Sequence, residues 1–398
     1  MRRIGFLLLL CLCLAGVWLL ANPLNAAQPA VNQSVATRPA PPQELADIPV
    51  FLLIDQASGQ TLIERQADLR FVPASMTKAM SAYVAFELMA QGKLRPEQTF
   101  AMRPETWEAW HGKGTSMNLR SGQSAPLDML LRGITTVSAN DAAVVLAEGV
   151  ARSVTDWAGL MNAEAAKLGM TNSHFGTPNG WPDNGATYVS ARDMVRLGDA
   201  LITRHGLLYH RYFGQKQFTW NNITQQNHDP TVGVIPGADG IKTGHTNEAG
   251  FNFLGSAERA NRRLIMVVGG AKREDQRTAA SRALLEWGFS AWQSRPLFAR
   301  GARVGEAKVQ GGDARQVDLL AARPIAAVLP GAAGKVTGLQ IVYRGPLRAP
   351  LARGAAVAEL EIQVDGMPPS RVPLVTARGI GKAGPLDRLR NGLMGLIP

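Results

Sequence analysis

Ser75 and Lys78 have residue types and a spacing that could carry out nucleophilic chemistry, in the pattern Ser75-Met76-Thr77-Lys78. On a helix, this spacing places the hydroxyl and the amine on one face, one turn apart. A serine hydroxyl is a poor nucleophile at neutral pH, but a desolvated lysine can lose its proton and act as the base. A position in the first turn would also place Ser75 at the positive end of the helix dipole, where developing negative charge is favoured. Because an S-x-x-K pattern arises about once by chance in a chain of this composition, the pair needs support from other motifs.

A second group, Ser138-Ala139-Asn140, follows an apolar stretch and precedes another predicted helix. A hydroxyl near the lysine could pass a proton to a departing amine, and the Asn140 carboxamide could hold a substrate amide. Ser138 could also be a helix N-cap, a common role for serine. The competing pattern Ser116-Met117-Asn118 lies among glycines in a predicted loop, so it is the weaker candidate.

The third group is Lys242-Thr243-Gly244, on a predicted strand that follows the turn at Asp239-Gly240. Lysine supplies positive charge, threonine supplies a hydroxyl for a carboxylate, and glycine lets a peptide approach the strand edge closely. A K-T-G pattern by itself is weak evidence for such a site. The three groups in this order match the set found in penicillin-recognising serine enzymes.

The elements that must position these groups are predicted to form an α+β domain. Residues 50–55 and 61–65 form a strand hairpin, and 74–90 form a helix that is apolar on nearly every face and therefore buried. The remaining elements are helices at 127–151, 157–168, 191–204 and 275–292, and strands at 240–243, 250–258 and 263–269. Strands on both sides of a helical middle predict an antiparallel sheet assembled from distant parts of the chain, with helices packed on it.

The ends of the chain have a different composition. Arg2 and Arg3 precede an apolar run at 4–21, which is typical of an export signal, although an uncleaved anchor is the alternative. From residue 297 onward, short apolar runs separated by glycine and proline predict a small all-β domain. Pro385 then opens a basic amphipathic helix, which could lie in a membrane interface or dock on the β domain.

We therefore expect five segments. Residues 1–27 are a signal peptide, 28–46 a flexible lead-in, 47–296 the catalytic domain, 297–376 a small β-sandwich-like domain and 377–398 a membrane-anchoring helix.

Composition excludes several functions. Both cysteines, Cys11 and Cys13, lie in the predicted signal, so the mature chain has no disulfide and no thiolate zinc site. No H-E-x-x-H pattern is present, and we expect neither metal nor cofactor. Removal of Arg2 and Arg3 lowers the formal charge of +11 by two, to +9. This charge favours phospholipid headgroups or anionic wall polymers over nucleic acid, for which no motif is present.

On these motifs the sequence resembles the low-molecular-mass penicillin-binding proteins, the D-alanyl-D-alanine carboxypeptidases that trim peptidoglycan stem peptides. Further stretches that carry the resemblance are 239–246, Gly269-Gly270 and 284–289. The resemblance covers nearly the whole chain. It implies a penicillin-binding, serine β-lactamase-like domain with a helical subdomain, and a place on the periplasmic face of the inner membrane.

The resemblance also implies roles for individual residues. Ser75 would be the acylated nucleophile, Lys78 the general base and Ser138 the proton relay. The remaining residues would bind substrate: Asn140, Lys242, Thr243, Gly244, Arg277 at the terminal carboxylate, and His245, whose backbone N–H would hold the oxyanion together with that of Ser75. β-Lactam antibiotics would be covalent inhibitors.

Two departures from the family and three rival functions remain open. Ala139 stands where many relatives have glycine or aspartate, and His228 stands in a stretch where some relatives carry arginine. A β-lactamase of the common serine class needs a carboxylate in a Glu-x-x-x-Asn loop, and residues 175–181 contain no acid. A D,D-endopeptidase would use the same chemistry on cross-links. A non-enzymatic wall-binding protein would require the loss of a catalytic residue, and all are present.

Overall fold

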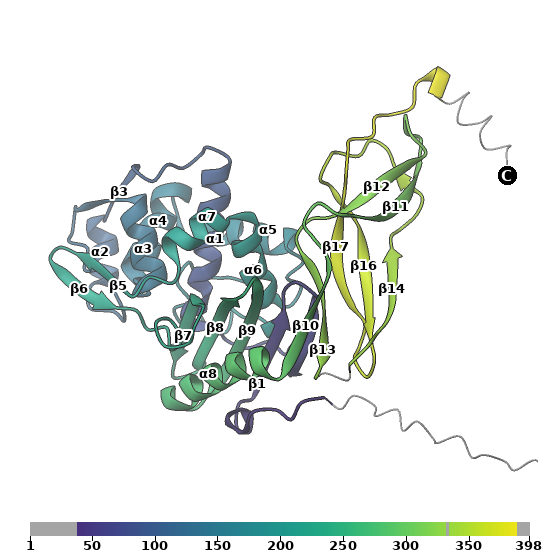
Figure 1. The fold of residues 1–398 in the computed structure, drawn as a ribbon. Coiled ribbons are helices and arrows are strands. Elements are labelled where there is room, and N and C mark those ends of the chain that lie inside the picture. Colours follow the sequence, from purple (N-terminus) through teal and green to yellow (C-terminus); the bar gives the residue numbers. More distant parts are fainter. Residues whose placement is uncertain (1–37, 332–333, 388–398) are drawn as a thin grey trace, which may run out of the picture. The chain divides into compact units, whose positions relative to one another are not determined.

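The structure is a computed structural model, shown in Figure 1, and it describes residues 38–331 and 334–387. The predicted signal peptide, most of the predicted lead-in and residues 388–398 of the predicted C-terminal helix lie outside the described residues.

A five-stranded antiparallel sheet forms the centre of the N-terminal part, in the order β2-β1-β9-β8-β7. Its strands are β1 (Val50–Asp55), β2 (Gln60–Arg65), β7 (Ala238–Thr246), β8 (Gly250–Arg259) and β9 (Arg262–Ala271). The prediction of a sheet built from distant parts of the chain is confirmed. Because β7 is the last strand in this order, its outer edge has no strand partner within the described residues.

Both faces of this sheet are covered by helices, as Figure 1 shows. Side chains alternate between the faces of a strand. In β9, Met266 packs in one buried cluster with Leu284 of α8 (Glu274–Ser290), whereas Val267 packs in a second cluster with Leu197 of α6 (Ala191–Arg204). The sheet therefore separates two apolar layers, and the second layer also contains the helical part of the domain.

The predicted helix at 74–90 is divided in two. Ala74–Met76 forms a 3₁₀ turn, and α1 follows at Thr77–Ala90. Ser75 therefore lies in the turn that leads into α1 and not in the first α-helical turn. Every residue of α1 from Thr77 to Phe86 is buried, so the prediction of a buried helix is confirmed.

The predicted helical stretch 127–151 is also two helices, α3 (Leu127–Thr136) and α4 (Asn140–Ala151). They are separated at Ser138, whose φ of 62° is incompatible with a continuous right-handed helix. α5 (Val154–Lys167) follows, and α8 ends at Ser290, so Trp292, predicted as helical, instead begins a strand.

Several short elements were not predicted from the sequence. They are α2 (Pro104–Trp110), α7 (Gly206–Tyr212), and the strand pairs β3 (Thr99–Ala101) with β4 (Ser124–Pro126) and β5 (Gln217–Trp220) with β6 (Ile223–Gln226).

The C-terminal part is all β, as predicted. β10 (Trp292–Phe298) pairs with β13 (Ile325–Pro330). A six-stranded sheet has the order β14-β16-β17-β12-β11-β15. Its strands are β11 (Arg303–Gln310), β12 (Gln316–Ala321), β14 (Val336–Val342), β15 (Leu347–Arg348), β16 (Ala356–Val364) and β17 (Ser370–Thr376). The predicted boundary after residue 296 falls within β10.

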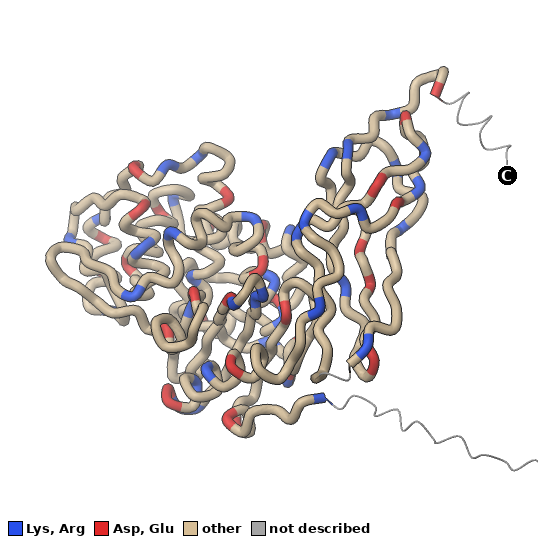
Figure 2. Tube along the Cα trace, in the orientation of Figure 1, with Lys and Arg blue, Asp and Glu red and all other residues tan. Residues whose placement is uncertain are grey.

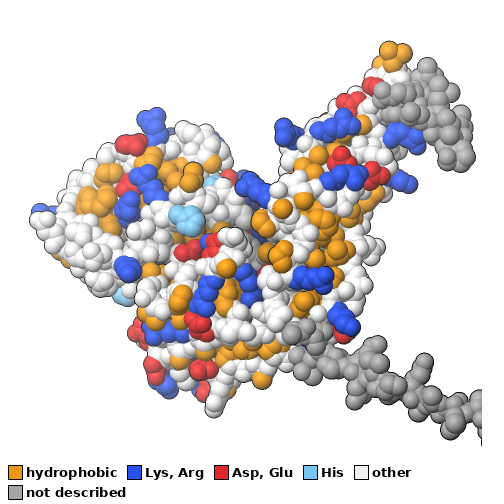
Figure 3. All heavy atoms as spheres, viewed as in Figure 1, with side chains coloured by type: hydrophobic (Ala, Val, Ile, Leu, Met, Phe, Trp, Pro, Cys, Tyr) orange, Lys and Arg blue, Asp and Glu red, His pale blue; other side chains and the backbone are white. Residues whose placement is uncertain are grey.

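Charged residues of both signs are interspersed along the described chain (Figure 2), and blue and red side chains lie near one another on the face seen in Figure 3. No helix within residues 38–331 or 334–387 is long and apolar enough to cross a bilayer.

Candidate active site

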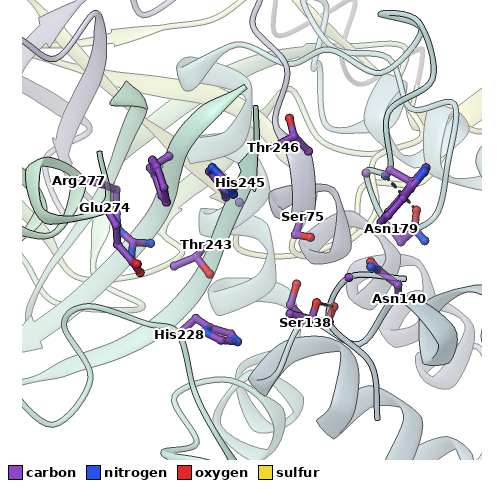
Figure 4. A pocket seen from close by; sticks show the side chains of 16 residues that line it. Ser75, Ser138, Asn140, Asn179, His228, Thr243, His245, Thr246, Glu274 and Arg277 are labelled. Carbon is purple, nitrogen blue, oxygen red and sulfur yellow. Dashed lines mark hydrogen bonds and ion pairs between the residues drawn. The ribbon is translucent and has the colours of Figure 1, made fainter. Parts of the chain in front are cut away.

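A cavity of about 340 Å³ lies where the turn before α1, the start of α4 and the edge strand β7 meet. Its walls include Ser75, Ser138 and Asn140 from the helical side, and Thr243, Gly244 and His245 from β7. Arg277, near the start of α8, completes one end. The cavity therefore unites residues from four distant parts of the sequence, as Figure 4 shows.

The side-chain amine of Lys78 joins two of these parts, the turn before α1 and the start of α4, to the loop that contains Asn179. The Nζ atom lies 2.8 Å from Ser75 Oγ, 2.8 Å from Asn140 Oδ1 and 2.7 Å from the carbonyl oxygen of Asn179. The side chain is fully buried. The predicted pairing of a serine hydroxyl with the lysine amine is present, and the lysine is held in place by two further acceptors.

The surroundings of Lys78 favour its neutral form. Burial lowers the pKa of Lys78 well below its ordinary value, and the positive charge of Lys242 lowers the pKa further, against an opposing effect of Asp141. Burial penalises the charged form of a lysine because an isolated charge is poorly solvated in a protein interior. A neutral amine within 2.8 Å of a hydroxyl can accept its proton.

Ser138 faces the same cavity from the break between α3 and α4. Its Oγ atom is buried and has no hydrogen-bond partner within the described residues. The residue at the N-cap of α4 is Ala139, and no side chain caps this helix, so the alternative that Ser138 is an N-cap is wrong. The hydroxyl is free to bond with a substrate group.

Gly244 lets the edge strand approach the segment that carries Ser75. A Cβ atom at this position would lie 2.3 Å from the carbonyl oxygen of Pro73 and 3.0 Å from the backbone nitrogen of Met76. Any other residue would therefore push β7 away from the serine. The imidazole of the next residue, His245, stacks on Phe251 with ring centroids 3.9 Å apart.

Positively charged and basic side chains gather at one end of the cavity. Figure 4 shows Arg277, Glu274, Thr243 and His228 on one side of Ser75, and Asn140 and Asn179 on the other. Arg277 is 3% exposed, and its guanidinium donates to Glu274 at 2.8 Å, while its Nε is buried without a partner among the described residues.

Lys242 lies buried behind this end and is not among the residues that line the cavity. Its Nζ donates to the carbonyl oxygen of Thr243 at 3.1 Å. Burial lowers the pKa of Lys242 to about 7, with Asp229 raising it and Arg277 lowering it further. Burial also lowers the pKa of His228 from 6.5. Positive charge at this end therefore comes from Arg277 and, below a pH of about 7, from Lys242, and this charge suits an anion.

Some lining residues were not predicted. Asn179, Trp181 and Glu274 line the cavity, and the Asn179 carbonyl contacts Lys78 directly. The Asn-Gly pair at 179–180 is a turn signal that could have marked the loop, but a backbone carbonyl carries no chemical signature in a sequence. Ser116, from the competing pattern 116–118, does not line this cavity, and its hydroxyl donates to Asp141 at 2.7 Å.

Comparison with known proteins agrees with this architecture. The D-alanyl-D-alanine carboxypeptidase family of S11 peptidases matches residues 36–273, and the C-terminal domain of penicillin-binding protein 5 matches residues 292–382. D-alanyl-D-alanine carboxypeptidase DacA of Escherichia coli (strain K12) is 35% identical over 345 residues, 84% of each chain.

Solved structures give the same result. Penicillin-binding protein 5 from Haemophilus influenzae superposes with a TM-score of 0.70 at 31% identity, covering 86% of this chain and 100% of that one. Penicillin-binding protein D2 from Listeria monocytogenes, in its ampicillin-bound form, gives a TM-score of 0.55 at 25% identity and covers 63% of this chain and 100% of its own.

The fold is thus that of the penicillin-binding class of serine enzymes. More narrowly, the chain belongs to the S11 family of D-alanyl-D-alanine carboxypeptidases.

Proposed function

We propose that this protein is a serine-type carboxypeptidase that removes the terminal D-alanine from peptidoglycan stem peptides ending in D-Ala-D-Ala. The observation that carries this proposal is the contact of Lys78 Nζ, whose pKa is lowered, with Ser75 Oγ in a cavity that has a basic end. Family membership supplies the substrate class.

In the proposed acylation step, Ser75 Oγ attacks the carbonyl carbon of the penultimate D-alanine while its proton passes to Lys78 Nζ. The backbone N–H groups of Ser75 and His245 hold the oxyanion. The C–N bond then breaks, and the proton on Lys78 Nζ passes through the Ser138 hydroxyl to the departing amine of D-alanine, which leaves Lys78 neutral again. Water subsequently hydrolyses the ester and restores Ser75. These roles are supported by the placement of Ser75, Ser138 and His245 around one cavity and by the hydrogen bond between the buried Lys78 and Ser75. The Ser138 hydroxyl has no competing partner among the described residues.

Substrate binding divides between the two ends of the cavity. Asn140 contacts the amide on the acyl side of the scissile bond. The terminal carboxylate of the substrate binds near Thr243 and Arg277, where the partnerless Nε of Arg277 offers a donor and Lys242 adds positive charge. An extended peptide would run along the outer edge of β7, which has no strand partner among the described residues, and Gly244 keeps this strand close to the turn that carries Ser75.

Penicillin would acylate Ser75 and leave slowly. Among the described residues that line the cavity, Glu274 carries the only carboxylate, and this carboxylate pairs with Arg277 instead of facing Ser75. A purified protein that turned over penicillin at many cycles per second would indicate a β-lactamase. Parallel assays on a free pentapeptide and a cross-linked dimer would separate the carboxypeptidase from a D,D-endopeptidase.

We further propose that the protein is exported and acts at the periplasmic face of the cytoplasmic membrane. The predicted signal at 1–27 and the basic amphipathic segment at 377–398 support this location. We also propose that the chain between these segments consists of a flexible lead-in at 28–46, a catalytic domain at 47–296 and a small β-sandwich-like domain at 297–376.

The test is mass spectrometry of the intact protein after exposure to penicillin. One covalent adduct is expected on the peptide that contains Ser75, and none in Ser75→Ala. Ser290→Ala, which removes an exposed hydroxyl from α8, is the matched control and should be acylated as the wild type is. An unmodified wild-type protein would overturn the proposal.

A further inference from the structure

Trp181 is a large apolar side chain that remains 38% exposed on the wall of the active-site cavity. The proposed acylation steps do not use it. Aromatic side chains that stay partly exposed in a concave site are well suited to bind apolar ligand groups, because contact with a ligand removes their surface from water.

The backbone of Trp181 is fixed next to the reacting residues. The preceding residue, Gly180, has a φ of +73°, and a Cβ atom there would lie 1.9 Å from the carbonyl oxygen of Ala74. The backbone N–H of Trp181 donates to Asn179 Oδ1 at 3.0 Å. The loop is therefore held against the turn that carries Ser75.

The indole ring is supported from behind as well. Trp110, in α2, meets it edge to face, with ring centroids 5.4 Å apart and an interplanar angle of 82°. Such pairs stabilise a defined ring orientation. The two tryptophans form what we call the aromatic wall, and a rigid wall loses little conformational entropy when a ligand binds.

A glycine keeps the space in front of this wall open. A Cβ atom on Gly114 would lie 2.7 Å from Asn140 Nδ2 and 3.1 Å from the indole ring of Trp181. Any side chain at position 114 would therefore fill the gap between the amide of Asn140 and the ring. Because position 114 is glycine, this gap is open to a group of a bound ligand.

The position of the gap identifies the part of the substrate that it receives. The basic end with Arg277 lies on one side of Ser75 and Asn140 on the other, as Figure 4 shows. A substrate whose carboxylate occupies the basic end must extend its acyl side toward Asn140, and hence toward the gap beside Trp181.

We propose that Trp181, supported by Trp110, is a specificity-determining residue that packs against apolar substituents on the acyl side of the scissile bond. The inference rests on the proposed function and names the substrate feature that this site prefers. The same wall would contact the acylamino side chain of a penicillin.

The test compares two penicillins that share the bicyclic nucleus and the carboxylate. Benzylpenicillin carries an aromatic acyl side chain, and 6-aminopenicillanic acid has none. Second-order acylation rates are measured by mass spectrometry for the wild type, Trp181→Ala, Trp181→Phe and Trp110→Ala. Leu207→Ala removes an apolar side chain that is 91% exposed on α7 and does not line the cavity, and it serves as the matched control.

Trp181→Ala should slow acylation by benzylpenicillin about tenfold, in the range that apolar pocket contacts provide, and leave 6-aminopenicillanic acid almost unchanged. Trp181→Phe should recover part of the loss, Trp110→Ala should show a smaller loss of the same kind, and Leu207→Ala should match the wild type. Equal losses with both penicillins, or no loss with benzylpenicillin, would overturn the inference and leave the proposed function intact. A wild-type protein that neither compound acylates would instead remove the proposed function, and the inference with it.

Discussion

The Nζ atom of Lys78 lies 2.8 Å from the Oγ atom of Ser75, and the lysine side chain is fully buried. Replacing Lys78 by arginine introduces a permanent positive charge and removes a group that can lose its proton. We therefore expect Lys78→Arg to slow acylation by about 10²–10⁴-fold. Acylation rates measured by stopped flow or by quenched mass spectrometry test this prediction.

Lys78→Met, which has no basic group, is the companion variant. Both variants should lose a similar amount of activity if the neutral amine is what matters. Near-normal acylation in Lys78→Arg would contradict the assignment of Lys78 as the base.

Ser138 allows a matched pair of variants because its φ is 62°. Alanine would remove the hydroxyl but stay strained, whereas glycine removes the hydroxyl and adopts this backbone freely. Both Ser138→Ala and Ser138→Gly should slow release of D-alanine by about 10²-fold or more if the hydroxyl relays a proton. Peptide turnover in Ser138→Gly close to that of the wild type would show that the hydroxyl is dispensable.

Lys242 predicts a pH dependence of anion binding. With a pKa of about 7, it is charged in the free protein below that pH and loses its charge as the pH rises through it. In Ser75→Ala, which cannot be acylated, the noncovalent dissociation constant of penicillin should be about tenfold larger at high pH, the order expected when a nearby positive charge is lost. Calorimetric titrations on both sides of pH 7 measure it.

The control for this titration is Lys242→Met in the same background. This variant should bind penicillin weakly at both pH values, which separates the effect of Lys242 from that of the nearby His228.

The effect of Lys242 on protein stability has the opposite pH dependence to its effect on penicillin binding. Between about 7 and the ordinary value of 10.5, the unfolded chain binds the additional proton, so Lys242 makes the free energy of unfolding rise with pH. Penicillin binding that tightened with rising pH would contradict the prediction.

The close approach of Gly180 to Ala74 indicates that the loop around residue 180 and the turn that carries Ser75 cannot move independently. In Gly180→Ala, the new Cβ would lie 1.9 Å from the Ala74 carbonyl, so either the loop or the turn that carries Ser75 must move. We expect a loss of about 2–4 kcal/mol in the free energy of unfolding, together with slower acylation.

Gly185→Ala is the control because its φ is also positive, at +81°, but nothing lies within 4 Å of its Cβ position. It should cost only the backbone strain, about 1 kcal/mol, and leave acylation unchanged. Equal effects of the two substitutions in denaturant unfolding would show that the contact with Ala74 is unimportant.

Local sequence patterns determined the chemical groups and most of the elements. The apolar residues of 74–90 indicated a buried helix, and the continuous apolar run within 263–269 indicated a strand that is buried on both faces. The spacing from Ser75 to Lys78 was enough to place an amine one turn from a hydroxyl.

The tertiary structure decided what those patterns could not. The break at Ser138 depends on a positive φ that an apolar helical period does not reveal. The contact of the Asn179 carbonyl with Lys78 joins residues 101 positions apart in the sequence. This contact and the exposure of Trp181 depend on how the loop that contains Asn179 and Trp181 folds back against α1. The pKa of Lys242 depends on burial and on the charges of Asp229 and Arg277. Sequence determines local periodicity, whereas contacts between distant segments and the desolvation they cause exist only once the chain has folded.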